Sequence, residues 1–103
     1  MDTLNLHTIS GSKVLSGREE GEMMRKKLKL DTRDFDEKKY SILVPEVFAV
    51  TASYFLACFG KSVRSLGKEK FEKKYIFKCN NNVSIENNIK DGIDSAIKLE
   101  LPF

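Results

Sequence analysis

The spacing of apolar residues changes along the chain and marks short strands that alternate with helices. Leucines alternate with polar residues over 4–9, which predicts a first strand. The stretch 40–50 is rich in β-branched and aromatic residues and predicts a second strand. Pro45 should interrupt this strand, because proline removes a hydrogen-bond donor from the ladder. A third strand is expected over 74–78, with a loop after it.

Helical spacing follows each of these strands. Helices are expected over 17–29, 52–66 and 83–98. The last one carries isoleucines at strict i, i+4 spacing, at positions 85, 89, 93 and 97. Its cap is either Asn82 or Ser84. Alternation of strand and helix in this order predicts an α/β domain with a parallel or mixed sheet and right-handed crossovers.

Two local signals lie on the first expected helix. Ser16 and Glu19 have the spacing of a capping box, in which each satisfies a backbone N–H group at the helix start. One helix face carries Gly17, Gly21, Met24 and Leu28. Two glycines weaken an isolated helix, so they either permit a close backbone approach or leave a helix that frays.

The second expected helix is apolar on more than one side. Its natural core face carries Phe55, Phe59, Ser62 and Leu66. Further residues that are apolar or nearly so are Tyr54, Leu56, Ala57 and Cys58. The helix is therefore either buried on two sides within the domain or exposes an apolar patch to a partner or a second copy. Gly67 should form a left-handed cap, and 68–71 a turn or single helical turn.

Composition and charge limit the class of protein. The 103 residues suffice for one domain over 1–103, and 41% apolar with 32% charged residues is typical of a globular protein. The net charge is +3, and glutamates are interleaved with both basic clusters, which argues against a nucleic-acid partner. The basic residues are Arg25, Lys26, Lys27 and Lys29, then Lys68, Lys70, Lys73, Lys74 and Lys78. With no membrane span or signal pattern, a cytoplasmic location is expected.

Few residues have the spacing that catalysis or metal binding needs. Cys58 and Cys79 are expected as free thiols, and His7 has no ligand neighbours for zinc. The stretch 60–62, Gly-Lys-Ser, resembles the end of a phosphate-binding loop, but Phe55 stands where that loop needs glycine. No catalytic group with an orienting neighbour is evident, so neither enzymatic activity nor a metal or other cofactor is expected.

One further stretch, 31–39, is charged throughout and is expected to be an exposed loop. Two of its carboxylates, Asp34 and Asp36, lie in a loop that is crowded with charge. Their pKa values therefore have no evident reason to move from the ordinary range.

Three segments, 16–28, 50–63 and 66–79, together resemble the STAS-like family, small bacterial domains related to anti-sigma factor antagonists. The residues that carry the resemblance are Arg18, Gly21, Ser53, Tyr54, Gly60, Lys61, Leu66, Gly67 and Phe71. With the last helix, the segments cover most of the chain. The resemblance implies a mixed sheet of about four strands with helices packed on it, in β-α-β-α-β-α order.

The resemblance also implies a regulatory binding module without a catalytic centre. Better-known relatives dock onto an ATPase-type kinase, which phosphorylates a serine at the start of the second helix and switches binding off. Ser53 occupies that place, and Thr51 is the neighbouring phosphoacceptor candidate. The candidates for partner contact are Tyr54, Leu56, Ala57 and Lys61.

This chain departs from the family pattern at two places on that helix. Thr51 stands where relatives with the switch have an acidic residue. Leu56 and Ala57 replace an acidic pair, so the expected contact face is more apolar than in those relatives. The expected partner is a protein, such as an ATPase-type kinase or sensor, or a second copy of the chain.

Overall fold

The computed structural model describes residues 1–8 and 11–98. Its elements are β1 (Asp2–Asn5), β2 (Val14–Leu15), α1 (Arg18–Lys27), α2 (Leu30–Arg33), β3 (Tyr40–Leu43), β4 (Ala49–Val50), α3 (Ala52–Phe55), η1 (Leu56–Gly60), α4 (Lys61–Leu66), α5 (Lys68–Lys74), β5 (Tyr75–Lys78) and α6 (Val83–Lys98). Over the described residues, no helix is both long and apolar enough to cross a membrane.

The strands form two small parallel sheets in a mixed α/β arrangement. β1, β3 and β5 lie side by side in that order, with Leu4, Ile42 and Phe77 in one row. β2 and β4 pair separately over two residues each. The described residues thus form sheets of three and two strands, all parallel, where a mixed sheet of about four strands was expected.

The interruption expected at Pro45 is confirmed and explains the second sheet. After β3, the Val44 N–H donates to the Lys78 carbonyl at 3.1 Å, and the chain then leaves the main sheet. The Phe48 N–H donates to the Lys13 carbonyl at 2.7 Å, which starts the pairing with β2. One apolar stretch therefore contributes a strand to each sheet, with proline at the change of partner.

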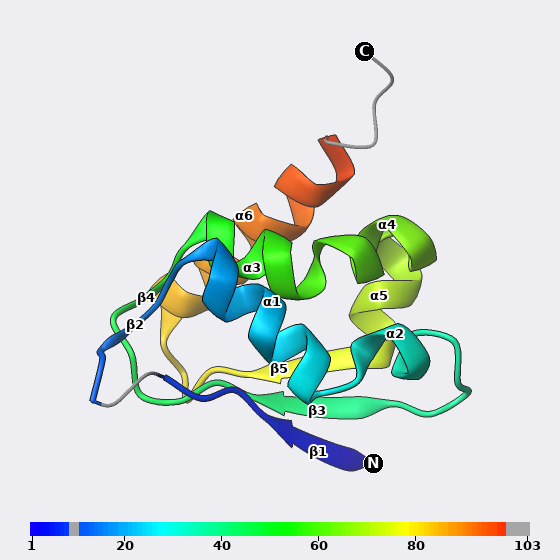
Figure 1. Cartoon of the computed structure of the whole chain (residues 1–103), viewed down its shortest axis with the longest axis horizontal. Coiled ribbons are helices and arrows are strands. Elements are labelled where there is room, and N and C mark those ends of the chain that lie inside the picture. Colours follow the sequence, from blue (N-terminus) through cyan, green and yellow to red (C-terminus); the bar gives the residue numbers. More distant parts are fainter. Residues whose placement is uncertain (9–10, 99–103) are drawn as a thin grey trace.

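The helices lie together on one face of the three-stranded sheet (Figure 1). Side chains on that face, such as Leu4 and Ile42, are buried. The opposite face carries Thr3, Asn5, Ser41, Leu43, Ile76 and Lys78. Parallel sheets are usually covered on both faces, and their strands are then continuously apolar. Here β3 alternates between buried and more exposed residues instead, and most of the side chains that face away from the helices are polar.

Aromatic rings fill the space between the sheet and the helices. Phe55 and Phe59 from the middle helical run contact Phe71 and Phe77, with ring centroids of Phe59 and Phe77 5.1 Å apart. α6 covers this cluster with the isoleucines predicted for its core face: three are buried and Ile97 is partly buried. The bounds of α6 agree with the prediction over 83–98. Asn82 is the cap, because its Oδ1 accepts the Ile85 N–H at 3.2 Å.

The middle helical run extends over 52–66 as predicted, but it is not uniform. A π-helical turn, η1, separates α3 from α4. Such turns are often found at functional sites. Thr51 caps the run, with its Oγ1 accepting the Tyr54 N–H at 3.3 Å. Gly67 ends it at a φ of 83°, although its ψ of 157° is outside the left-handed helical region that was expected.

The start of α1 differs from the expected capping box. Gly17 is the N-cap residue, at a φ of 91° that favours glycine, and no side chain of the described residues caps the helix with a hydrogen bond. Ser16 therefore lies one position too early, so the predicted box with Glu19 is wrong. The close approach predicted for the glycine face is confirmed at Gly21, where an added Cβ would lie 2.4 Å from the Tyr54 carbonyl oxygen.

Candidate partner-binding groove

A groove of about 440 Å³ lies between α1 and the helical run α3–η1–α4. Its lining residues are Arg18, Glu22, Arg25, Ser53, Leu56, Ala57, Lys61 and Arg64. The close packing of Gly21 on Ala57 and on the Tyr54 backbone brings the two helical segments together beneath it. Four of the residues predicted from sequence for phosphorylation or partner contact thus lie in one groove, namely Ser53, Leu56, Ala57 and Lys61.

Ser53 is exposed in this groove and does not cap the helix. Thr51 and Ser53 both place a hydroxyl at the helix start, where serine and threonine commonly serve as caps, and the structure assigns the cap to Thr51. The Ser53 Oγ lies 3.2 Å from the Thr51 Oγ1, with either group able to donate. The fold therefore needs Thr51 for capping and leaves the Ser53 hydroxyl at the surface.

Tyr54 lies in the core and does not line the groove. Its side chain is 2% exposed, and burial raises the pKa of its hydroxyl well above the ordinary range. Among the described residues the hydroxyl has no hydrogen-bond partner, and Tyr54 borders a cavity of about 30 Å³ beside Ser16 and Glu20.

Leu56 and Ala57 form the apolar floor of the groove. Both are partly buried, and Leu56 packs against the main hydrophobic core. The sequence left two alternatives for this helix, burial on two sides within the domain or an apolar patch exposed to a partner. The structure shows some of each: Tyr54 and Cys58 are buried, whereas Leu56 and Ala57 are partly open. The open part is narrow, and charged side chains border it.

Cations outnumber anions around the groove. Arg18 forms an exposed ion pair with Glu22 at 3.1 Å, and Lys61 lies 3.7 Å from Asp31. Arg64 has no ion pair within the described residues. Exposed pairs of this kind are weak, so the arginines and the lysine can turn toward an anionic ligand at little cost.

Arg25, at the base of the groove, belongs to a buried polar network that the sequence did not reveal. Its Nη1 donates to the Cys58 carbonyl at 2.8 Å and to the Ser62 Oγ at 2.9 Å. Its Nη2 donates to Asp31 at 2.7 Å and to Asp34 at 3.0 Å. Burial alone would lower the pKa of Arg25, but the two carboxylates outweigh this and raise it. The guanidinium therefore remains charged in the interior.

Asp34 is the centre of this network and is 3% exposed. Besides Arg25, it accepts the Ser62 hydroxyl at 2.8 Å and the Tyr75 hydroxyl at 2.6 Å. These partners come from α1, α4 and β5, so one carboxylate joins three elements. Each buried charge is paired and hydrogen-bonded, as such groups must be.

A second polar cluster lies nearby, around Lys74. Its Nζ donates to the Asp36 carboxylate at 2.7 Å and to the Asp36 and Lys38 carbonyls at 2.8 Å each. The Tyr40 hydroxyl also donates to Asp36. The expectation of an exposed loop over 31–39 is confirmed only in part. Most of these residues are exposed, but the first of them belong to α2, and Asp34 and Asp36 tie the stretch to the fold.

The pKa of Asp36 moves, which also corrects the sequence-based expectation. Burial alone would raise it, but the hydrogen bonds from Lys74, Tyr40 and the Lys38 backbone outweigh this and lower the pKa from 3.8 to about 2. A carboxylate with a depressed pKa in the folded state stabilises the fold above its unfolded pKa, and this contribution is lost as the pH falls toward its folded pKa.

Acid titration of stability tests the role of Asp36. We expect the urea midpoint of the wild type to fall between about pH 4 and pH 2, and this fall to be smaller in Asp36→Asn, which has no carboxylate to protonate there. The control is Glu37→Gln, which removes an exposed neighbouring carboxylate and should retain the wild-type pH dependence. Parallel curves for all three proteins would contradict the assignment.

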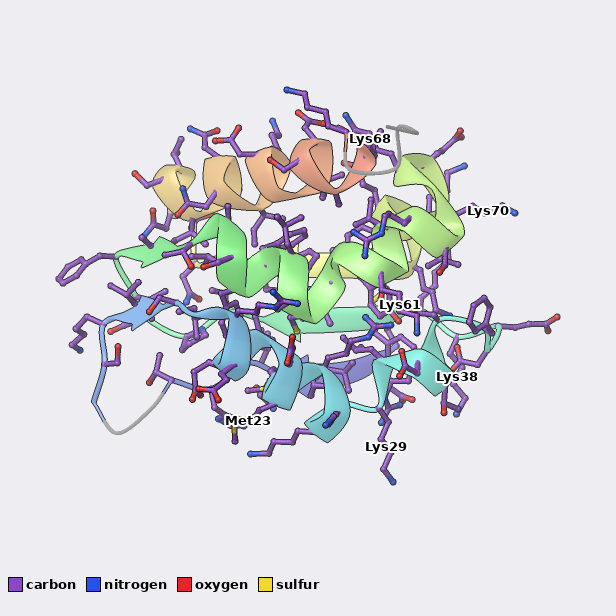
Figure 2. All side chains as sticks on the ribbon, turned by 45° about the horizontal axis from the view of Figure 1, so that its top comes forward. Met23, Lys29, Lys38, Lys61, Lys68 and Lys70 are labelled. Atoms are coloured by element: carbon purple, nitrogen blue, oxygen red, sulfur yellow. The ribbon has the colours of Figure 1, made fainter. Side chains whose placement is uncertain are left out.

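The two basic clusters noted in the sequence each lose a member to the interior, Arg25 and Lys74. Figure 2 shows two of the remaining lysines, Lys29 and Lys70, extending outward from the ribbon. Others are paired at the surface, such as Lys68 with Asp94 at 3.2 Å. The positive electrostatic field at the surface is therefore weaker than the number of basic residues alone indicates.

Other chemistry has little support in the described residues. They contain no group of three side chains that could hold a metal ion. Cys58 and Cys79 are free and buried, and burial raises the pKa of Cys58 to about 12 and also raises that of Cys79.

No family model matches the chain, and comparisons with curated proteins and with solved structures found no match. The resemblance to the STAS-like family therefore remains a prediction.

Proposed function

We propose that this chain is a non-enzymatic regulatory module of the STAS-like type, which binds a protein partner such as an ATPase-type kinase through the groove. The observation that carries the proposal is the exposed Ser53 hydroxyl, free of a capping role and set in a groove with an apolar floor. A serine that the fold does not need, at the start of a helix that lines a groove, is well placed for regulation.

The groove offers two kinds of contact to a partner. Leu56 and Ala57 supply apolar surface, while Arg18, Lys61 and Arg64 supply positive charge at its border. Apolar contacts contribute affinity, and complementary charges at the rim favour the correct partner and speed encounter. The groove therefore suits an acidic protein segment that carries one or two apolar side chains.

Phosphorylation of Ser53 would change this surface. A phosphate adds about 1.5 to 2 negative charges, and the nearby cations of the groove would pair with it. The field that attracts an acidic partner would then be neutralised, and the phosphate itself would repel the partner. Binding is thus expected to be switched off, as the resemblance implies.

Photo-crosslinking tests the proposal and identifies the partner in the same experiment. A crosslinking amino acid is placed at Lys61, in the groove, or at Lys90, an exposed lysine on α6 that serves as the matched control. In a native lysate we expect a distinct protein adduct from position 61 and not from position 90, with its identity given by mass spectrometry. Equal adducts from both positions would exclude docking in the groove.

The switch is tested in the same assay with two further variants. Ser53→Asp should reduce the adduct at least about 10-fold, since the added charge mimics part of the phosphate effect. Ser53→Ala should leave the adduct unchanged, because Thr51 caps the helix. An adduct of equal yield in both variants would show that Ser53 does not control binding, even if the groove does bind.

A further inference from the structure

An exposed phenylalanine projects from the connection between the two sheets. Phe48 is 77% exposed, and the backbone that carries it is fixed on both sides. The Val44 N–H is bonded to β5, the Phe48 N–H is bonded to Lys13, and Pro45 stiffens the segment between them. A large apolar side chain held in this way loses little conformational freedom on binding, which favours an interaction surface.

A pocket of about 330 Å³ lies directly beside this side chain, and Phe48 forms part of its wall. The pocket is floored by three buried apolar residues, Val47, Cys79 and Ile85. Val83, the first residue of α6, is 66% exposed and follows Asn82, which lines the pocket. A projecting aromatic ring therefore shares one patch with a pocket that has an apolar floor and a polar rim, to which Asn80 and Asn82 also belong.

Two charges of opposite sign border the same pocket, Lys13 and Glu46. Neither forms an ion pair with another of the described residues. The patch thus combines a projection with a recess, and a positive with a negative charge. These are the features that a surface needs to pair with a second copy of itself across a two-fold axis.

We propose that the chain forms a two-fold dimer in which Phe48 of each copy enters the pocket of the other. Lys13 then faces the partner's Glu46, and the same contact is repeated on the other side of the axis. Because each patch supplies both halves of the contact, the arrangement closes at two copies and does not propagate into a fibre. This surface shares no lining residue with the groove, so partner binding and dimer formation can occur together.

The patch lies at the β2–β4 end of the molecule, away from α2, α4 and α5 (Figure 1). Phe35, 71% exposed and next to α2, is therefore a matched control for Phe48: an equally exposed phenylalanine outside the patch. Substitution of either residue removes no buried contact, so both variants should remain folded, as circular dichroism will verify.

The test is the solution mass by light scattering over a concentration series. With increasing concentration, the average mass of the wild type should rise from 11.8 kDa to twice that value. Phe35→Glu should show the same rise. Phe48→Glu should weaken dimer formation at least about 30-fold, as expected for a central interface residue. A wild type that stays monomeric throughout, or equal effects of the two substitutions, would overturn the proposal.

Charge reversal identifies the surface more specifically. Lys13→Glu and Glu46→Lys should each weaken the dimer about 10-fold, because each places like charges opposite one another. The double variant should regain wild-type association, and an equimolar mixture of the two single variants should form the mixed dimer. Failure of both forms of rescue would exclude the proposed pairing, even if Phe48→Glu is monomeric.

Discussion

Replacing Asp34 with alanine is expected to cost about 3 to 5 kcal/mol of unfolding free energy, the largest effect of any substitution considered for this chain. The change leaves the Arg25 guanidinium in the interior without its buried counter-ion, and the Ser62 and Tyr75 hydroxyls without an acceptor. A buried charge that loses its partner is far more costly than a surface charge. Urea unfolding followed by circular dichroism measures the loss.

The matched control is Asp31→Ala, since Asp31 binds the same guanidinium from the surface. Its side chain is 68% exposed, compared with 1% for Asp34. Removal of an exposed partner of an ion pair costs about 1 kcal/mol or less. Equal losses for the two variants would show that burial of Asp34 contributes nothing to the network.

The second large effect is expected at Gly21. Alanine there should cost about 3 kcal/mol, because its Cβ would lie 2.4 Å from the Tyr54 carbonyl oxygen and 2.7 Å from the Ala57 Cβ. Neither of these atoms belongs to a flexible side chain, so α1 must move away from the helix beneath it. The movement would also reshape the groove, and we expect a weaker adduct from a crosslinker at Lys61.

Gly60→Ala is the control for this substitution, because Gly60 is also a buried helical glycine. There the nearest atom to an added Cβ is the Nη1 of Arg64 at 3.2 Å, at the end of a flexible and exposed side chain. The gain in helix propensity is about 1 kcal/mol, so stability should change by less than this amount. Urea midpoints that fall equally for both alanine variants would contradict the tight contact at Gly21.

The sequence predicted those parts of the fold that depend on neighbouring residues along the chain. α6 was predicted at its observed bounds, because a strict i, i+4 row of isoleucines defines one face and Asn82 supplies a cap. The break at Pro45 could be predicted because proline lacks the backbone N–H donor, and this lack interrupts the pairing of any strand. The glycine face left two alternatives open, and the structure shows the close approach at Gly21 but not at Gly17.

The polar interior could not be predicted, because its partners are distant in sequence. Asp34 and Lys74 appear as members of charged runs, and only the fold brings Asp34 to Tyr75, 41 positions away. The π-helical turn within 52–66 likewise has no local signal, and it lies where α1 packs closely against that run. In the groove, Ser53, Leu56 and Lys61 were predicted from resemblance, whereas the contributions of Arg18 and Arg64 became evident from the packing.

The open face of the three-stranded sheet makes this chain convenient for site-specific labelling. Both native cysteines are buried with raised pKa values, and a thiol in that state reacts slowly with maleimides. A single cysteine at Thr3, exposed on the face away from the helices, would therefore take a fluorophore selectively. A dye there borders neither the groove nor the Phe48 pocket, so one labelled protein can report binding at both surfaces in separate titrations.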